Sequence, residues 1–260
     1  MSEQQGQEQQ QDGQGTYVYG VVRAGTSLDE LAEEEGMPPV ALLEAGDLAA
    51  IVGDAPPDDQ TATRDAVMAH SKVLAAAVRN AGVVPMRFGI VFPSDEAVRD
   101  ELLEGRKDEL ISRLDKVDDK VQMTLKVYFR EDAFLRELVE SNPEIARLRK
   151  ATRQGSEEQT YNDRVRLGEL INNGLEQRRE QLANELMETM KPHAVTSVTE
   201  GLEKDLMVLN APFLVEQSRV SEFDSAVEDI AGDETELLHF KLLGPMPAYH
   251  FIDTEEPAWA

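Results

Sequence analysis

The sequence predicts an α+β protein built from two domains of related topology. Stretches rich in β-branched residues alternate along the chain with amphipathic helical stretches. The order strand–helix–strand–strand–helix–strand (βαββαβ) occurs twice, and this is the split βαβ order of ferredoxin-like folds. The length of 260 residues, of which 41% are apolar, is enough for two hydrophobic cores.

The first βαββαβ series is expected between residues 16 and 118. The run from Thr16 to Val22 is β-branched and aromatic, so it is predicted to be the first strand. A short helix capped by Ser27 and a hairpin around Glu44-Ala45-Gly46-Asp47 follow. The remaining elements are a helix over 61–80, a strand over 83–92 and a helix from Ser94 that is broken near Gly105.

The second series is expected between residues 119 and 246, as a ferredoxin-like domain with a long inserted helix. Apolar residues alternate from Val121 to Phe129, which predicts a half-buried strand. Helices with a break at Asn142-Pro143 come next, because proline suits the first turn of a helix. The later elements are the long helix, two paired strands, a helix and a last strand, over residues 156–190, 195–200, 206–216, 221–231 and 236–243.

Both ends of the chain are predicted to be tails. Residues 1–15 hold seven Gln and three Gly, and so few apolar side chains cannot offset the entropy that ordering would cost. This segment is therefore expected to be disordered. Residues 247–260 follow the last strand and are expected to form a C-terminal tail.

The charge excludes some classes of partner. The 51 acidic residues outnumber the 26 basic ones and give a net charge of −25, which repels phosphates and anionic lipid head groups. Neither nucleic acid nor a lipid membrane is therefore an expected partner. The acid excess indicates either a halophilic surface or recruitment of a basic partner, and its spread along the whole chain favours the halophilic interpretation. Without Cys, and with no recognisable signal peptide or membrane span, a cytoplasmic protein is expected.

The sequence predicts no catalytic, cofactor or metal site. The residues His70, His193, His239 and His250 lack the spacing of metal ligands. His70 lies on the apolar face of its helix, where a buried imidazole bonded to the backbone is expected in preference to a ligand or base. The many carboxylate pairs are interpreted as a solvated face, because a carboxylate needs burial to acquire an unusual pKa. A non-enzymatic protein is therefore expected.

Two apolar features allow more than one interpretation. The long helix carries an apolar stripe from Leu167 to Met190, which suits packing on its own sheet or a seam for a partner helix. Pro212 interrupts an apolar strand and is expected at a sheet edge or a bulge, because proline cannot donate a ladder hydrogen bond. An exposed edge there could pair with a strand of another chain.

Six short runs follow one another along the chain: Tyr17-Val18-Tyr19-Gly20-Val21-Val22, Gly46-Asp47-Leu48-Ala49-Ala50-Ile51-Val52, His70-Ser71-Lys72-Val73-Leu74, Val84-Pro85-Met86-Arg87-Phe88-Gly89, Asn210-Ala211-Pro212-Phe213-Leu214-Val215 and Gly244-Pro245-Met246-Pro247-Ala248-Tyr249-His250-Phe251. In this order they resemble the F/L family of gas vesicle proteins over residues 16–252. In the last run, Met246 and Ala248 replace a Trp and a Pro that are usual in the family. The acid excess and the Gln-rich tail are similar to a haloarchaeal L-type member.

The resemblance implies two α+β domains, the second a modified ferredoxin-like one, and a role as an accessory protein of gas vesicle assembly. Family members bind the hydrophobic major shell protein, prevent its aggregation and contact other accessory gas vesicle proteins. The resemblance implies no enzymatic activity and no cofactor, and it allows association with the vesicle. The alternatives are a minor structural component of the shell, or a small-molecule-binding or enzymatic ferredoxin-like module.

The candidate contacts for partners are Met and aromatic side chains near the ends of predicted strands. Such side chains serve recognition surfaces as well as cores, so internal packing is the competing interpretation for each of them. The candidates are Met86, Phe88, Phe213, Met246, Tyr249 and Phe251.

Overall fold

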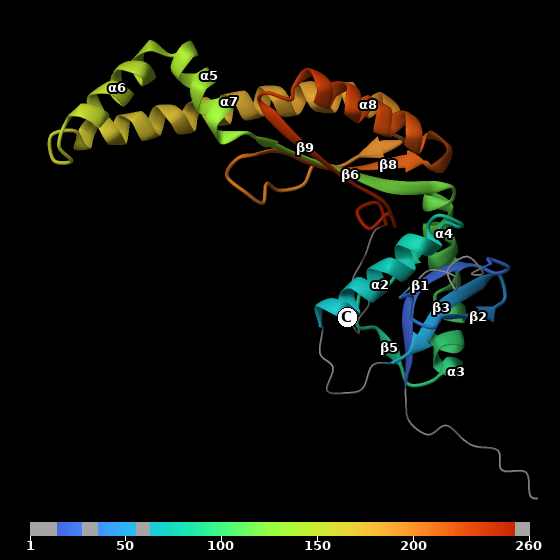
Figure 1. The fold of residues 1–260 in the computed structure, drawn as a ribbon. Coiled ribbons are helices and arrows are strands. Elements are labelled where there is room, and N and C mark those ends of the chain that lie inside the picture. Colours follow the sequence, from blue (N-terminus) through green and yellow to red (C-terminus); the bar gives the residue numbers. More distant parts are fainter. Residues whose placement is uncertain (1–14, 28–35, 56–62, 253–260) are drawn as a thin grey trace, which may run out of the picture. The chain divides into compact units, whose positions relative to one another are not determined.

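The computed structural model describes residues 15–27, 36–55 and 63–252, which form two compact units (Figure 1). Unit 1 contains the chain up to Val121 together with the described residues from Pro245 onward, and unit 2 contains Gln122–Gly244. The predicted α+β class is confirmed, because helices pack against two antiparallel sheets. Residues 1–14 of the tail predicted over 1–15, residues 253–260 of the tail predicted over 247–260, and most of the predicted helix after Ser27 lie outside the described residues.

Unit 1 is built on a five-stranded sheet in which the neighbours are β2-β3-β1-β4, with β5 also paired to β1. Its strands are β1 (Thr16–Arg23), β2 (Ala41–Ala45), β3 (Leu48–Asp54), β4 (Val84–Pro85) and β5 (Val91–Phe92). The predicted hairpin joins β2 to β3, and Gly46 makes its turn with a φ of 59°, which glycine adopts without strain. The register of β1 against β3 shifts between Val18 and Gly20, so Tyr19 is the extra residue of a β-bulge.

The helices described in unit 1 cover this sheet and complete its core. They are α2 (Arg64–Ala77), the short α3 (Asp95–Ala97), a π-helical turn (Val98–Glu104) and α4 (Lys107–Val117). The side chain of Thr63 caps α2 by accepting a hydrogen bond from the N–H of Ala66 at 3.2 Å. Leu74 of α2 lies directly over Gly20 of β1, where an added Cβ would be 3.0 Å from Leu74 Cδ2. Glycine at position 20 therefore lets α2 approach the strand closely.

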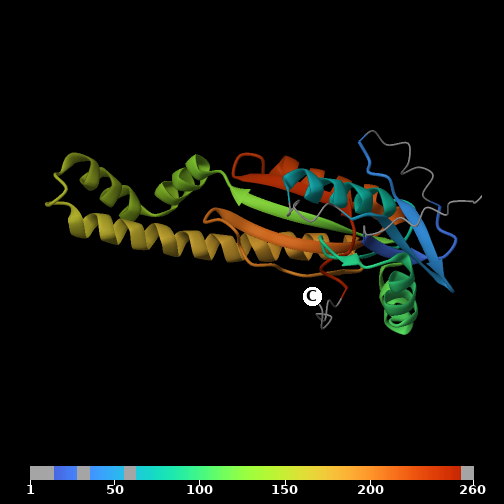
Figure 2. The same ribbon diagram turned by 90° about the horizontal axis from the view of Figure 1, so that it is seen from below.

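Unit 2 has a four-stranded sheet in which the neighbours are β7-β8-β6-β9. Its strands are β6 (Lys120–Phe129), β7 (Thr196–Ser197), β8 (Met207–Glu216) and β9 (Leu238–Met246). The helix α8 (Val220–Asp233) and the C-terminal half of α7 (Tyr161–Met190) lie together on one face of this sheet (Figures 1 and 2). Their core side chains include the fully or nearly fully buried Leu182, Leu186, Met190, Phe223 and Val227.

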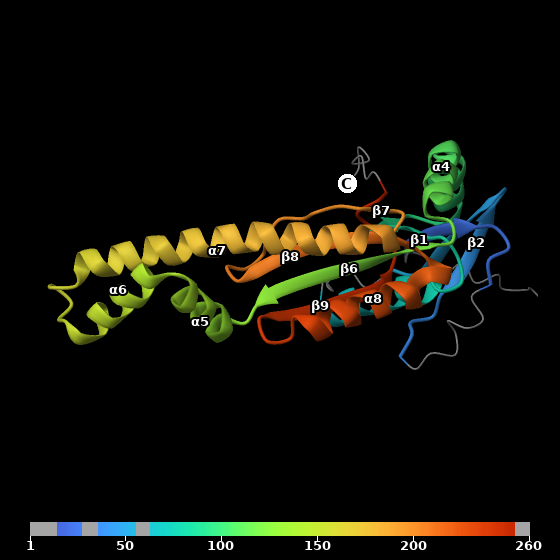
Figure 3. The ribbon, with the colours of Figure 1, turned by 90° about the horizontal axis from the view of Figure 1, so that it is seen from above.

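Three helical segments of unit 2 extend beyond its sheet, and we call them the helical arm: α5 (Glu131–Ser141), α6 (Pro143–Gln154) and the N-terminal half of α7 (Figure 3). The predicted break at Asn142-Pro143 separates α5 from α6. Asn142 Oδ1 accepts hydrogen bonds from the N–H groups of Glu144 at 3.0 Å and Ile145 at 3.4 Å, so it caps α6.

The apolar stripe of α7 has two environments. Its C-terminal members Leu182, Leu186 and Met190 are buried on the sheet, which agrees with the interpretation that the stripe packs on its own sheet. Its N-terminal members remain half-buried in the helical arm: Leu167, Leu170, Ile171 and Leu175. Packing on the sheet therefore explains only the second half of the stripe.

Pro212 was expected at a sheet edge or a bulge, and the sheet edge was wrong. Its strand β8 lies between β7 and β6. The carbonyl of Pro212 accepts a hydrogen bond from the N–H of Val198 at 3.0 Å, but proline has no N–H to donate in return. The regular β7–β8 pairing covers only Thr196 and Ser197, so the missing donor is accommodated on the side of a very short strand.

Candidate functional site

Four aromatic rings of unit 1 form a cluster that we call the aromatic cluster: Tyr17, Tyr19, His70 and Phe88. Tyr17 and Tyr19 belong to β1, His70 to α2, and Phe88 follows β4. The ring centroids of Tyr17 and Tyr19 are 4.8 Å apart, and the rings of Tyr19 and His70 stack at 5.4 Å. Phe88 meets His70 edge to face at 5.7 Å. Tyr17 and Tyr19 are two residues apart on β1, so both rings can enter the same cluster.

A chain of hydrogen bonds fixes the orientation of these rings. His70 Nε2 lies 3.2 Å from the carbonyl oxygen of Met86, which can only accept, so Nε2 carries the hydrogen. His70 Nδ1 is then an acceptor, and the hydroxyl of Tyr17 donates to it at 2.8 Å. The N–H of Gly89 donates to the same Tyr17 oxygen at 3.1 Å. His70 is therefore a buried, neutral imidazole with both nitrogens bonded, which agrees with the expectation of backbone bonding.

The surroundings of the cluster favour its uncharged forms. Burial lowers the pKa of His70, and the hydrogen bond to Met86 opposes this only in part. Burial raises the pKa of Tyr17, against a smaller opposite effect of the Gly89 N–H. Burial also raises the pKa of Tyr19, and the nearby Tyr17 and Asp54 add to the effect. A set of groups held neutral in this way suits packing and recognition better than proton transfer.

The run after β9 returns to unit 1 and places Tyr249 near the cluster. Two local turns shape it, in which the N–H of Tyr249 donates to Pro247 at 2.8 Å and that of Phe251 donates to Ala248 at 3.0 Å. Ala248 and Ile252 are buried at 1% and 4% exposure and anchor the run, whereas Tyr249 keeps 40% of its surface exposed. Burial raises the pKa of Tyr249 to about 12, and the proximity of Tyr17 contributes to this shift.

The six predicted contact residues fall into three groups. Phe213 is completely buried, with its ring 5.2 Å from that of Phe223, so a partner could reach it only if unit 2 unfolded. Met86 is nearly buried, and its backbone bonds Tyr19 and His70. The other four reach the surface wholly or in part: Phe88, Met246, Tyr249 and Phe251.

The structure brings together two runs that lie far apart in the sequence. Residues 84–89 supply Met86, Phe88 and Gly89 to the aromatic cluster, and residues 244–251 supply Tyr249 beside it. Tyr17 and Tyr19, which join these runs, were not among the predicted contacts. Their placement at alternate positions of a strand was the only local signal that the two rings could share a face.

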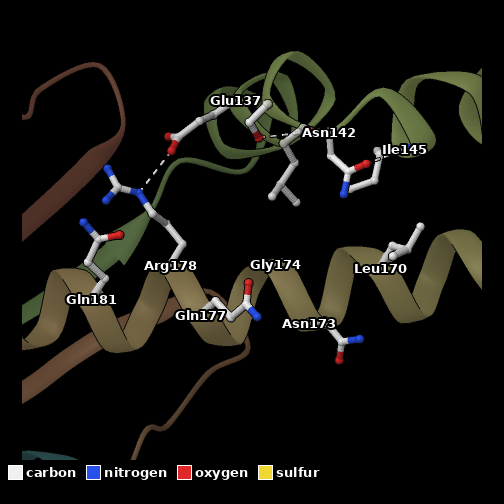
Figure 4. A pocket seen from close by; sticks show the side chains of 11 residues that line it. Glu137, Asn142, Ile145, Leu170, Asn173, Gly174, Gln177, Arg178 and Gln181 are labelled. Atoms are coloured by element: carbon white, nitrogen blue, oxygen red, sulfur yellow. Dashed lines mark hydrogen bonds and ion pairs between the residues drawn. The ribbon is translucent and has the colours of Figure 1, made fainter.

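A second concave feature lies on the helical arm of unit 2. A hollow of about 460 Å³ opens between α5, the start of α6 and the middle of α7 (Figure 4). Glu137 and Arg178 face each other across it and form an ion pair at 3.0 Å. The remaining lining is mainly amide and aliphatic, with Asn173, Gln177 and Gln181 along α7. The carboxylate of this hollow is thus already paired, and its lining offers no histidine.

The described residues hold neither a cluster of metal ligands nor a helix that could span a membrane. No three His, Asp or Glu side chains gather there as a metal ion would require. No helix within the described part of the chain is long and apolar enough to cross a membrane.

Comparison with known proteins identifies relatives that cover nearly the whole chain. The family model described as "Gas vesicle synthesis protein GvpL/GvpF" matches residues 15–253. A gas vesicle protein F from a Streptomyces species is 36% identical over 92% of this chain and 99% of its own length. A gas vesicle protein L from the same organism is 27% identical over 92% of this chain and 93% of its own length. Both types of the family are thus among the relatives of this chain.

A solved structure has the same fold. The crystal structure of the gas vesicle protein GvpF from an Anabaena species superimposes with a TM-score of 0.75, over 94% of this chain and all of that chain, at 22% identity. The resemblance of the six sequence runs to the F/L family is thereby confirmed at the level of family. The chain belongs to the GvpL/GvpF family of gas vesicle synthesis proteins.

Proposed function

We propose that the protein is a non-enzymatic accessory protein of gas vesicle assembly that binds the hydrophobic major shell protein and other accessory gas vesicle proteins. The match to the family model over residues 15–253 carries this proposal, because the model describes proteins of gas vesicle synthesis. A shell subunit that exposes a large apolar face tends to associate, and covering that face keeps it soluble. The acidic exterior, with a net charge of −25, discourages association of the resulting complexes.

The surface that we assign to this contact centres on Tyr249, with Phe88, Met246 and Phe251 as further members. Tyr249 combines a large exposed ring with a firm support, because Ala248 and Ile252 beside it are buried. A ring held in this way loses little side-chain entropy on binding, which is the property of an aromatic anchor in protein interfaces. A tyrosine can cover apolar surface with its ring while its hydroxyl keeps a hydrogen bond.

Co-expression with the major shell protein tests the proposal directly. The full chain is expected to hold the shell protein in the supernatant and to co-purify with it, whereas Tyr249→Ala should lose most of the bound shell protein. Tyr161→Ala is the matched control, since Tyr161 is more exposed, at 66%, but belongs to α7 of unit 2. This variant should keep the shell protein bound.

Two results would contradict the proposal. The first is a wild-type chain that neither retains the shell protein nor changes vesicle formation when its gene is deleted. The second is an equal loss of binding in both tyrosine variants, which would show that Tyr249 is not a specific contact for the shell protein. Recovery of the chain in washed vesicles at a fixed ratio to the shell protein would instead support a structural component of the shell.

A further inference from the structure

Four basic side chains lie close together on α6, although the protein as a whole is acidic. Arg147, Arg149, Lys150 and Arg153 fall within seven residues, and no acidic residue occurs between Glu144 and Glu157. All four basic residues are exposed. Because the whole chain carries a net charge of −25, this helix presents a local potential of the opposite sign.

The acidic residues that border this basic segment are occupied by other arginines. Glu144 pairs with Arg166 of α7 at 3.4 Å, and Glu157 pairs with Arg164 of α7 at 3.0 Å. Within the described residues, none of the four basic side chains of α6 is engaged in an ion pair. Their charges are therefore available to a partner without the loss of an internal interaction.

Three of these side chains share one side of α6. Residues three and four apart are neighbours on a helix surface, so Arg149, Lys150 and Arg153 form a continuous flank. Together with Ala146 and Gln154 they line a shallow hollow of about 310 Å³, and we call these five residues the basic flank. A different side of α6, with the buried Ile145 and Leu148, packs on α7 and fixes the orientation of the flank (Figure 3).

We propose that the basic flank docks an acidic segment of a partner protein. Guanidinium groups bind carboxylates through two parallel hydrogen bonds, and two of the three charged residues here are arginines. Carboxylates at i and i+4 on a partner helix are spaced about 5–6 Å apart, which matches the spacing along the flank. Binding here is separate from the shell-protein contact proposed for unit 1, since it rests on α6 alone.

A nucleic acid fits this surface less well than a short acidic segment. The charged part of the flank covers five residues, about 7 Å of helix. A long polyanion bound there would continue over the acidic remainder of the protein and be repelled. A short run of carboxylates can occupy the flank and end before it meets that repulsion.

Fluorescence anisotropy with a labelled Glu/Ala peptide, which has glutamates at i and i+4, tests the proposal on the full chain. At low salt the wild type is expected to bind this peptide, and a Gln/Ala peptide of the same length should not bind. Affinity should fall steeply as the salt rises, because the Debye length shortens to about 10 Å at 0.1 M. The triple variant R149Q/K150Q/R153Q should weaken binding about tenfold or more.

The matched control is K107Q/K191Q/R219Q, which removes the same number of charges from residues that do not border α6 and are already paired with Asp47, Glu188 and Glu222. It is expected to bind within about twofold of the wild type. Circular dichroism of both variants should match that of the wild type, because all six side chains lie outside the buried core.

Several outcomes would overturn the assignment. The Gln/Ala peptide could bind as tightly as the Glu/Ala peptide, or both triple variants could weaken binding equally. Either result would show that the basic flank is not a specific site for acidic segments. Tighter binding of an oligo-dT of matched charge, lost in R149Q/K150Q/R153Q, would assign the flank to nucleic acid instead. A dimer in sedimentation velocity that this variant dissolves would make a second copy of the chain the occupant.

Discussion

The hydroxyl of Tyr17 and Nδ1 of His70 lie 2.8 Å apart, although 53 residues separate the two in the chain. This bond ties β1 to α2, and the second bond of the imidazole, to the carbonyl of Met86, ties α2 to the segment after β4. Three elements of unit 1 thus meet on one neutral ring. Protonation of His70 would place a hydrogen on Nδ1, which now accepts the Tyr17 hydrogen.

The first prediction concerns the pH dependence of stability. Burial lowers the pKa of His70 in the folded protein, so the unfolded state takes up a proton at a higher pH than the folded state. The stability that neutral His70 contributes should be complete above about pH 6.5. It should fall as the pH drops toward the pKa of His70 in the folded protein, by at most about 1.4 kcal/mol per pH unit. Urea unfolding at a series of pH values between about 7 and 5 measures this, since carboxylates titrate mostly below that range.

The replacement His70→Phe should remove this pH dependence. It should also lower the free energy of unfolding by about 1–3 kcal/mol near neutral pH, because it leaves the Met86 carbonyl and the Tyr17 hydroxyl without their partner. The control His239→Gln changes an exposed histidine of β9 and should leave the pH dependence in place. A wild-type stability that is flat over the whole range would refute the prediction.

The second prediction concerns the ionisation of Tyr249. Its phenol should titrate near pH 12, because burial and the nearby Tyr17 both disfavour the phenolate. Because this pKa is raised, the stability that the neutral phenol of Tyr249 contributes is complete below about pH 10 and is lost as the pH rises further. The ultraviolet absorbance of phenolate, compared between wild type and Tyr249→Phe, gives the titration of this single group. A difference curve centred near pH 10 would show that Tyr249 is fully solvated.

The third prediction concerns Phe213 and Tyr249, both of which the sequence predicted as partner contacts. Phe213→Ala should destabilise the protein by about 3–5 kcal/mol, because a fully buried ring packed on Phe223 is removed. Tyr249→Ala should cost less than half as much, since 40% of that side chain is already exposed. Chemical denaturation of both variants measures the difference, and equal costs would contradict the burial described for them.

The fourth prediction compares two glycines of α7. An added Cβ at Gly168 meets nothing within 4 Å, so Gly168→Ala should stabilise the helix by about 0.5–1 kcal/mol. A Cβ at Gly174 would lie 2.7 Å from Leu138 Cδ2 of α5, and that side chain would have to shift. Gly174→Ala should therefore gain less than Gly168→Ala in thermal unfolding. A larger gain at Gly174 would mean that α5 does not pack closely on α7.

The sequence predicted most of the local structure, because the signals for it are local. Asn142-Pro143 supplies both a capping side chain and a proline suited to a first turn, and α6 begins there. The apolar alternation from Val121 to Phe129 predicted the strand β6, but not that Gln122 and Thr124 are buried as well. Those two polar side chains bond each other at 3.0 Å, and no periodicity shows such a pair in advance.

The sequence could not predict which candidate contacts reach the surface. Met86 and Phe88 are two residues apart, yet one is nearly buried and the other half-exposed. Both residues contact β1 and α2, more than fifteen residues away in the chain, so the exposure of each depends on partners that are distant in the sequence. The expectation for Pro212 failed for a similar reason, since the short strand β7 that flanks it has almost no sequence signal of its own.

Unit 1 takes residues from both sides of unit 2, and this ordering has a consequence for synthesis. Ala248 and Ile252, which are buried in unit 1, leave the ribosome only after all of unit 2 has been translated. Unit 2 is contiguous and can fold as soon as it emerges, whereas the surface that carries Tyr249 is completed last. A nascent chain therefore lacks the proposed shell-protein contact until residues 245–252 have left the ribosome.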